Sequence, residues 1–191
     1  MALVLTSGPA LEPVTVAEAK AHLRVDGDAE DTLIASLILT SRLHVEAALD
    51  VALITQSWRL QLDRWPRSGE LQMPMRPLQS IDEVRVLSAA GDPTIVAAGT
   101  YAVDVAGTPP RLVRLAGVWP LPGRTANGIE IDFTAGYGAA ATDVPANVRQ
   151  ALLLLIAHWY EHRDPIEVGA ADVAVPPAVS ELLAPLRIAR L

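Results

Sequence analysis

The stretch Pro145-Ala-Asn-Val-Arg-Gln-Ala-Leu-Leu-Leu-Leu-Ile-Ala-His-Trp-Tyr-Glu-His-Arg163 carries the strongest structural signal in the chain. Proline is favoured as the first residue of a helix, and Asp164 precedes Pro165, a position that resists helical geometry, so a helix is expected from Pro145 to about Arg163. Apolar side chains surround its axis on nearly all sides, which predicts a central, buried helix. Truncating Leu154 or Leu155 is therefore expected to cost about 2–5 kcal/mol of stability.

Two further helices are expected near the N-terminus. Thr15 and Glu18 have the spacing of a capping box, which predicts a short helix ending at about Val25. A second helix is expected from about Ala29 to Leu49, with Asp28 as its cap. Its apolar residues recur at three- and four-residue steps and form one stripe: Leu33, Ile34, Leu37, Ile38, Val45, Ala48 and Leu49. The opposite face is expected to carry the polar residues Glu30, Arg42 and Glu46.

Beyond Leu53 the chain changes to short alternating segments, the pattern of half-buried strands. Strands are expected within residues 53–64, 71–73, 80–87, 94–96, 101–105, 111–115 and 129–133, separated by Gly, Pro, Asn or Asp. The segment Ala89-Ala-Gly-Asp-Pro93 predicts a hairpin tip. Gly136-Tyr-Gly138 lacks the lysine and spacing of a phosphate-binding loop and predicts the bend that returns the chain to a helix.

The predicted fold class is α+β, a helical bundle frame with a β-rich insertion. Residues 1–52 and 139–191 would form the frame and residues 53–138 the insertion, together one structural unit. A last short helix is expected from Ala178 to about Ile188, after a loop that contains Pro176 and Pro177. With 191 residues, of which 51% are hydrophobic, the chain is long enough to bury a substantial core.

Composition disfavours several classes of function. The net charge is -7 and the 15 basic residues are scattered, which disfavours direct DNA binding. The absence of cysteine excludes disulfides and thiolate metal sites. The longest purely apolar run, Ala151–Ala157, is far shorter than the roughly 20 residues of a membrane-spanning helix, so no membrane association is expected. No basic residue precedes the apolar start of the chain, so no secretory signal is expected and the protein would stay in the cytoplasm of the cell that makes it.

One segment resembles a catalytic motif. His158-Trp-Tyr-Glu161-His162 fits the inverted zinc-protease pattern H-x-x-E-H, with both histidines on one helix face. A small zinc-dependent hydrolase with Glu161 as its base is therefore the alternative function. Such a site needs a third protein ligand, and the carboxylates downstream are Glu167, Asp172 and Glu181. The favoured interpretation is that Trp159 packs inward while both histidines belong to a polar last turn. No metal, cofactor or catalytic residue is then expected.

Aromatic and leucine side chains are the candidates for contacts with partners. Trp65 and Trp119 each precede a proline at a predicted strand end or loop, and tryptophan is enriched at protein interfaces. Leu182, Leu183 and Leu186 lie on the amphipathic C-terminal helix. These five residues are predicted to lie at partner interfaces.

Several of these segments, taken in order, resemble a known family. They are Val14-Thr-Val-Ala-Glu-Ala-Lys-Ala-His-Leu-Arg24, Leu53-Ile-Thr-Gln-Ser-Trp58, Asp63-Arg-Trp-Pro66, Tyr101-Ala-Val-Asp104, Ile129-Glu-Ile-Asp-Phe-Thr-Ala-Gly-Tyr-Gly138 and His158-Trp-Tyr-Glu-His-Arg163. Together they resemble the head–tail connector adaptors of long-tailed phages, including those of phage-derived gene transfer agents. The resemblance spans nearly the whole chain up to Asp164. It departs from the family pattern mildly at the Pro77-Leu78 step, where Pro-Val is more usual.

The resemblance implies a non-catalytic structural protein of the virion or gene transfer agent particle, placed at the head–tail junction. Copies of the chain would form a ring beneath the portal protein and bridge it to a stopper or tail-terminator protein of the neck. DNA would pass through this ring without specific binding, which suits a negatively charged chain. The segment after Asp164 would dock on the portal or on a neighbouring copy.

Overall fold

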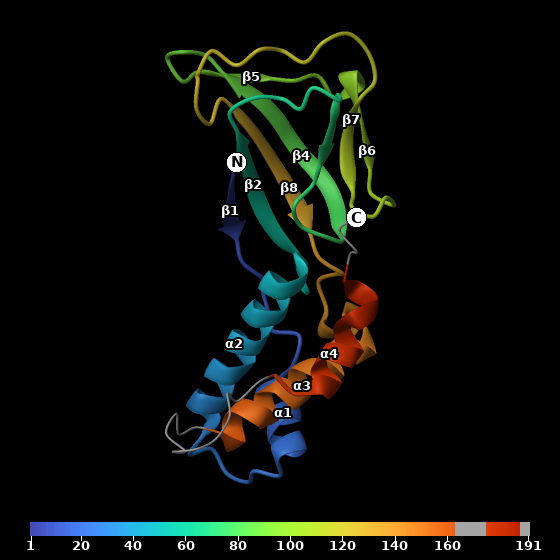
Figure 1. Ribbon diagram of the computed structural model, residues 1–191. Helices are drawn as coiled ribbons and strands as arrows, with labels where there is room; N and C mark the ends of the chain where they lie inside the picture. The colour runs from blue at the N-terminus through green and yellow to red at the C-terminus, as the bar shows by residue number, and fades with distance from the viewer. Residues whose placement is uncertain (163–174, 188–191) are drawn as a thin grey trace, which may run out of the picture. The chain divides into compact units, whose positions relative to one another are not determined.

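The computed structural model describes residues 1–162 and 175–187 and divides the chain into two compact units (Figure 1). The β unit contains Met1–Ala10 and Asp50–Tyr137, and the helical unit contains Leu11–Leu49 and Gly138–Leu191. The chain crosses from one unit to the other three times, after residues 10, 49 and 137. The protein contains both helices and antiparallel sheets, which confirms the predicted α+β class.

The division of the chain differs from the predicted one at the N-terminus. The prediction placed residues 1–52 in a helical frame, whereas residues 1–10 belong to the β unit. The reason is strand β1 (Ala2–Ser7), which pairs antiparallel with β2 (Gln56–Leu62) and places Leu3 opposite Leu60. No local pattern in residues 1–10 reveals this distant partner.

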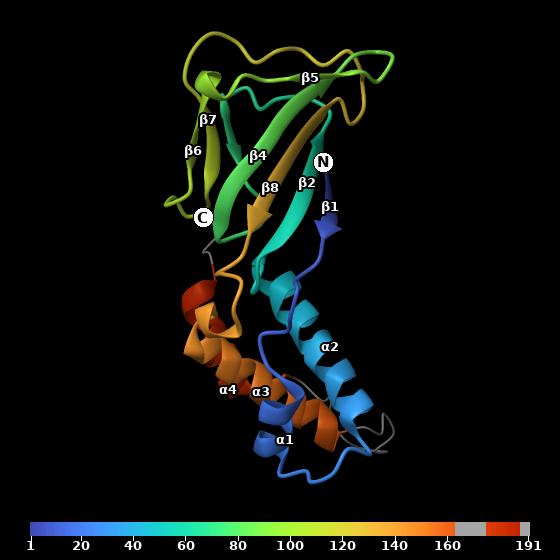
Figure 2. The same ribbon diagram turned by 180° about the vertical axis from the view of Figure 1, so that it is seen from behind.

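A five-stranded antiparallel sheet forms the larger part of the β unit. Its order is β1, β2, β8 (Ile129–Ala135), β4 (Leu78–Leu87) and β5 (Pro93–Ile95). Figures 1 and 2 show β8 in the middle of this sheet, between β2 and β4. Strands β4 and β5 are joined at the predicted hairpin tip, where the Ser88 amide donates to the Asp92 carbonyl at 2.9 Å.

A second, three-stranded sheet completes the β unit and closes its core. It contains β3 (Glu70–Gln72), β7 (Arg111–Arg114) and β6 (Tyr101–Asp104) in that order. The core combines residues of both sheets: Leu60, Ile129, Ile131 and Phe133 from the larger sheet, and Leu71 and Leu112 from the smaller one. Burial alternates strictly along β8, so its intervening residues face away from the core.

Gly136 makes the predicted bend after β8. Its φ is +137°, and a Cβ atom added there would lie 2.6 Å from the carbonyl oxygen of Ile54, closer than atoms can approach. Its amide donates to the Pro77 carbonyl at 2.8 Å. Only glycine permits the backbone at position 136 to lie this close to the backbone at Ile54 and Pro77.

The first helix of the helical unit, α1 (Val16–Leu23), has the predicted capping box. The Glu18 amide donates to Thr15 Oγ1 at 3.2 Å, and the Thr15 amide donates to Glu18 Oε2 at 2.8 Å. Two backbone donors at the helix start are thus satisfied by side chains. Helix α1 packs against both α2 (Asp31–Leu49) and α3 (Ala146–Glu161).

The polar face predicted for α2 is wrong for two of its three residues. Arg42 and Glu46 are buried, with exposed fractions of 5% and 6%, while Leu39 and Leu43 of the same helix are exposed. Glu12, distant in sequence, accounts for this, because its carboxylate accepts from Arg42 Nε at 2.7 Å. Arg42 Nη1 also donates to Glu46 at 2.8 Å, so the charges neutralise one another inside the unit.

By length and composition α2 could cross a membrane. Core helices of globular proteins meet the same criterion. Here the helix packs between α1 and α3 and buries Ile34, Ile38 and Val45 together with its charged pair. These contacts identify α2 as a core helix of the helical unit.

Helix α3 contacts every other helix of its unit (Figure 1). Its buried residues are Val148, Ala151, Leu152, Leu155 and Ile156. Leu153 and Leu154 are only half-buried, so the predicted burial on all sides is partly realised. The last helix, α4 (Pro177–Leu183), buries Val179 and Leu183 and packs against α3.

Candidate assembly surfaces

The two histidines of the zinc-protease pattern lie at the C-terminal end of α3. Their ring centroids are 4.6 Å apart, but Nδ1 of His162 lies 2.8 Å from the carbonyl oxygen of His158 and hydrogen-bonds to it. Glu161 is exposed, and Trp159 makes an edge contact with His44 of α2 at a centroid distance of 5.6 Å. These contacts are those of a helix end packed against its neighbour.

Within residues 1–162 and 175–187, no three His, Cys, Asp or Glu side chains are placed to hold a metal ion together. Of the carboxylates that could complete the motif, Glu181 is exposed on α4. Glu167 and Asp172 lie outside the described residues. A hydrolytic zinc site would need a third ligand beside the pair, and the described side chains do not provide one.

Trp65 and Trp119 pack against each other inside the β unit. Their rings stack at a centroid distance of 4.1 Å and an interplanar angle of 8°, and Trp65 Nε1 donates to the Pro120 carbonyl at 2.9 Å. Both side chains are buried within their own chain. Trp119 also lines a hollow of about 430 Å³ beside the exposed Ile95 and Val118. The interface role predicted for the two tryptophans stays a prediction.

The three candidate leucines of the C-terminal helix differ in exposure. Leu183 is buried, whereas Leu182 and Leu186 are half-buried. Asn147 Nδ2 of α3 donates to the Leu182 carbonyl at 2.8 Å, which ties α4 to its own chain. Leu182 and Leu186 therefore keep some surface for a partner, while Leu183 is engaged in the helical unit.

The outer face of the large sheet carries a network of ion pairs. Arg59 Nε donates to Asp132 Oδ1 at 2.7 Å, and Arg85 Nε donates to Glu130 Oε2 at 2.8 Å. Arg85 also contacts Asp132 at 2.9 Å and pairs with Glu83. Each arginine thus faces at least two carboxylates.

The network lowers the pKa of Glu130 and of Asp132. Burial alone would raise the pKa of Glu130, but hydrogen bonds from Arg85 and Gln61 outweigh burial and hold this pKa below its ordinary value. For Asp132, too, burial acts to raise the pKa, and the hydrogen bond from Arg59 with the charge of Arg85 lowers it overall. Glu130 and Asp132 therefore stay ionised at neutral pH, paired with Arg59 and Arg85.

This network was not predicted from the sequence. Its signal is a charged residue at every second position of neighbouring strands: Arg59 in β2, Glu130 and Asp132 in β8, and Glu83 and Arg85 in β4. Recognising it requires the strand pairing, which places Arg59 opposite Asp132 and Arg85 opposite Glu130.

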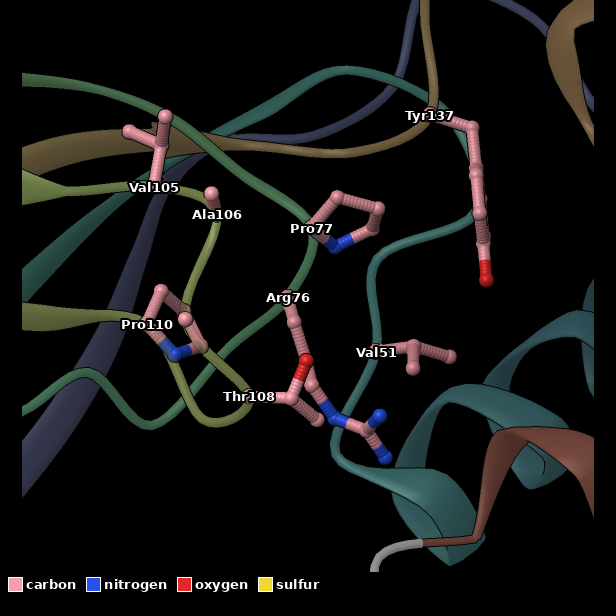
Figure 3. A pocket seen from close by; sticks show the side chains of 9 residues that line it. Val51, Arg76, Pro77, Val105, Ala106, Thr108, Pro110 and Tyr137 are labelled. Atoms are coloured by element: carbon pink, nitrogen blue, oxygen red, sulfur yellow. The ribbon is translucent and has the colours of Figure 1, made fainter.

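A small pocket of about 150 Å³ lies within the β unit near Arg76 and Tyr137 (Figure 3). Its lining consists of Val51, Arg76, Pro77, Val105, Ala106, Gly107, Thr108, Pro110 and Tyr137. Burial raises the pKa of the Tyr137 phenol, and the charge of Arg76 partly offsets this. These lining residues include no carboxylate, histidine or cysteine, and their side-chain hydroxyl groups are those of Thr108 and Tyr137.

Three solved structures similar to this chain come from gene transfer agent particles. A chain in the neck of an empty gene transfer agent particle, computed with C6 symmetry, is 30% identical, with a TM-score of 0.84 over 100% of this chain and 97% of the other. A chain in the virion of a native gene transfer agent particle is 32% identical, with a TM-score of 0.83 and the same coverage. No family model and no curated protein sequence matches the chain.

This chain belongs to the head–tail connector family of long-tailed phages and phage-derived gene transfer agents. A third similar chain, 30% identical over 98% of this connector with a TM-score of 0.74, comes from the neck of a native gene transfer agent particle computed with C12 symmetry. The connector is thus a structural protein of the particle, placed at the head–tail junction.

The segments that carry the resemblance have structural roles in the connector. Those around Trp58 and Phe133 form the central pairing of β2 with β8. The segment around Glu18 forms the capped helix α1, and Asp63-Arg-Trp-Pro66 holds the stacked Trp65. In this chain these segments therefore maintain the subunit's fold.

Proposed function

We propose that this connector forms a ring between the portal protein and the neck of the tail, and that this ring joins the head to the tail without catalysing a reaction. The observation that carries the proposal is the similarity of the whole chain, over both units, to a chain of a gene transfer agent neck. Full coverage matters here, because a shared single domain would support only a shared fold.

Ring formation requires that one surface of a copy meets a different surface of the next. The necks that contain the similar chains were computed with C6 and C12 symmetry, in which such contacts repeat. Within the described residues, β1 and β5 each pair with a strand on one side only, so they are the two edge strands of the large sheet. The backbone groups along both edges are therefore available to a neighbouring copy.

DNA would pass through this ring without specific binding. A net charge of -7 repels the DNA backbone, and the arginines of the large sheet are occupied by carboxylates. The portal protein would contact one side of the ring and a stopper or tail-terminator protein the other.

The test is deletion of the gene in a cell that produces the particles. We expect filled heads and separate tails in electron micrographs, and restoration of joined particles by a plasmid copy. Normal numbers of tailed particles from the deletion strain would contradict the proposal. A reconstruction of the neck with the restored protein would then show which neighbour each side of the ring meets.

We also propose that the segment after Asp164 contacts the portal or a neighbouring copy. Truncation at Asp164 is a poor test, because it removes α4 and exposes the α3 surface beneath Val179 and Leu183. Substitution of the half-buried Leu186 by Glu is cleaner. If tails join normally to particles that carry this folded variant, Leu186 has no part in the contact.

A further inference from the structure

Beyond its first residue Asp31, whose side chain is 43% exposed, the exposed face of α2 carries no aspartate, glutamate, lysine or arginine. Its exposed residues are Thr32, Ala35, Ser36, Leu39, Thr40, Leu43, His44, Ala47 and Ala48. They recur at three- and four-residue steps and so form one continuous strip, which we call the α2 strip. Leu39 and Leu43 have exposed fractions of 43% and 51%.

The placement of charge on this helix is the reverse of the usual one. A surface helix of a soluble protein buries apolar side chains and exposes charged ones. In α2, Arg42 and Glu46 face inward and pair with each other and with Glu12, while Asp31 pairs with Lys20 of α1 at 2.6 Å. Burial of charges in this way is costly. As a result, the outer surface of the helix beyond Asp31 is free of charge.

Electrostatics favours a second copy of this chain as the occupant of the strip. Each copy carries a net charge of -7, so two copies repel each other overall. An uncharged strip removes this repulsion at the contact. Ala35, Ala47 and Ala48 permit close approach of a neighbouring backbone, and Leu39 and Leu43 supply apolar area.

We propose that the α2 strip packs against the adjacent copy of this chain in the assembled ring. The proposal rests on the ring proposed above and names the surface that closes it. In a ring the contact is heterologous, so the strip of one copy meets a different surface of the next. A membrane would be the other apolar partner of such a strip, and a different neck protein the other protein partner.

Cross-linking from a single cysteine identifies the occupant, because the chain has no cysteine of its own. Leu43→Cys places a thiol in the strip, and Ala21→Cys places one at an exposed position of α1 in the same unit. Each purified variant would be labelled with a photoreactive maleimide and then assembled into particles. Activation of the label in the particles should join two copies of this chain from position 43 and not from position 21.

Other products overturn the proposal. A product that contains a different neck protein would assign the strip to that protein, and absence of any product from position 43 in particles would show the strip to be free. Flotation of the purified wild-type protein with phosphatidylglycerol vesicles would assign it to a membrane.

Charge placed in the strip provides a second test. Ala35→Glu and Leu39→Glu should leave the fold intact, since both side chains are exposed, but should reduce incorporation into particles by at least about tenfold. Ala21→Glu, the same change as Ala35→Glu on the exposed side of α1, should have no such effect. Normal incorporation of both strip variants would overturn the proposal, and if either fails to fold, the cross-linking result decides.

These outcomes separate the two proposals. If the wild-type chain is absent from particle necks, or if particles join tails without it, the proposed function fails. If the chain is present and required but position 43 contacts something else, only the assignment of the strip fails.

Discussion

Leu154 and Leu155 are neighbours in α3 with different surroundings. Leu155 is fully buried, whereas Leu154 is half-buried. The apolar run Ala151–Ala157 predicts equal burial for both, because pattern alone cannot show which side of an all-apolar helix the unit leaves uncovered. The structure separates them through contacts with α1, α2 and α4.

Substitution of each leucine by alanine should therefore give different losses of stability. We expect Leu155→Ala to lower the free energy of unfolding by about 2–5 kcal/mol, since a cavity remains in a closed core. Leu154→Ala should cost less, on the order of 1–2 kcal/mol. Urea denaturation followed by circular dichroism at 222 nm measures both. Equal losses would show that the outer side of α3 is as tightly packed as the inner.

Asp132 accepts hydrogen bonds from both Arg59 and Arg85, so Asp132→Asn removes a charge that two cations share. We expect a loss of about 1–3 kcal/mol at neutral pH. The folded pKa of Asp132 lies below its ordinary value of 3.8 and that of Glu130 below 4.5, so this stability is present above those values. It is lost as pH falls through the lower folded pKa values.

The difference between wild type and Asp132→Asn should consequently shrink as the pH is lowered below about 4. Denaturation curves recorded from pH 7 to pH 3 test this. A difference that stays constant over that range would mean that Asp132 stabilises the sheet by packing and not by its charge.

At the scale of elements, the side chain of Thr15 stabilises the N-terminal end of α1 by accepting a hydrogen bond from the Glu18 amide. Thr15→Ala removes the acceptor of the Glu18 amide and should cost about 0.5–2 kcal/mol. Thr15→Ser keeps the hydroxyl and should cost little. Thermal unfolding of both variants measures the effect, and an equal loss in the serine variant would assign the role of Thr15 to its methyl group.

Strand β1 protects the adjacent edge of the large sheet. Deletion of residues 1–7 would turn β2 into an edge strand, with its backbone groups and Leu60 uncovered on that side. Uncovered strand edges favour association of sheets. We expect the deletion variant to aggregate at concentrations at which wild type is monodisperse by light scattering, and an unchanged scattering profile would contradict this role.

Most elements could be predicted from the sequence, because their signals are local. The Thr15–Glu18 cap, the β4–β5 hairpin tip and the bend at Gly136 depend on residues close together in the chain. Strand partners could not be predicted. Pairing of β1 with β2, and of Glu12 with Arg42, depends on chain folding over long distances.

At the scale of the whole molecule, the sequence pointed to a structural protein of a phage-like particle through ordered segments spread over its length, and the similar solved structures confirm the family. The candidate surfaces were less accessible to sequence reasoning. Trp65 and Trp119 have the composition of interface residues but stack inside the β unit. The α2 strip could not be predicted from the sequence, because its uncharged surface depends on the burial of Arg42 and Glu46.

The paired arginines also make a prediction about nucleic acid. Wild type should pass through a heparin column at physiological salt, because its cations are neutralised within the subunit. The double variant Glu130→Gln with Asp132→Asn leaves Arg59 and Arg85 with fewer carboxylates and should be retained longer. Equal elution of the two proteins would show that these arginines are not accessible to a polyanion.

The interleaving of the two units along the chain has a consequence for synthesis. The central strand β8 is synthesised about 70 residues after its neighbour β2. The number of residues synthesised between α2 and its neighbour α3 is larger still. The β unit cannot close until the ribosome has passed Tyr137, and the helical unit cannot close until α3 is complete at Glu161. A copy terminated before β8 therefore lacks a complete core in either unit, and we expect its exposed apolar surface to make it a substrate for cellular proteases.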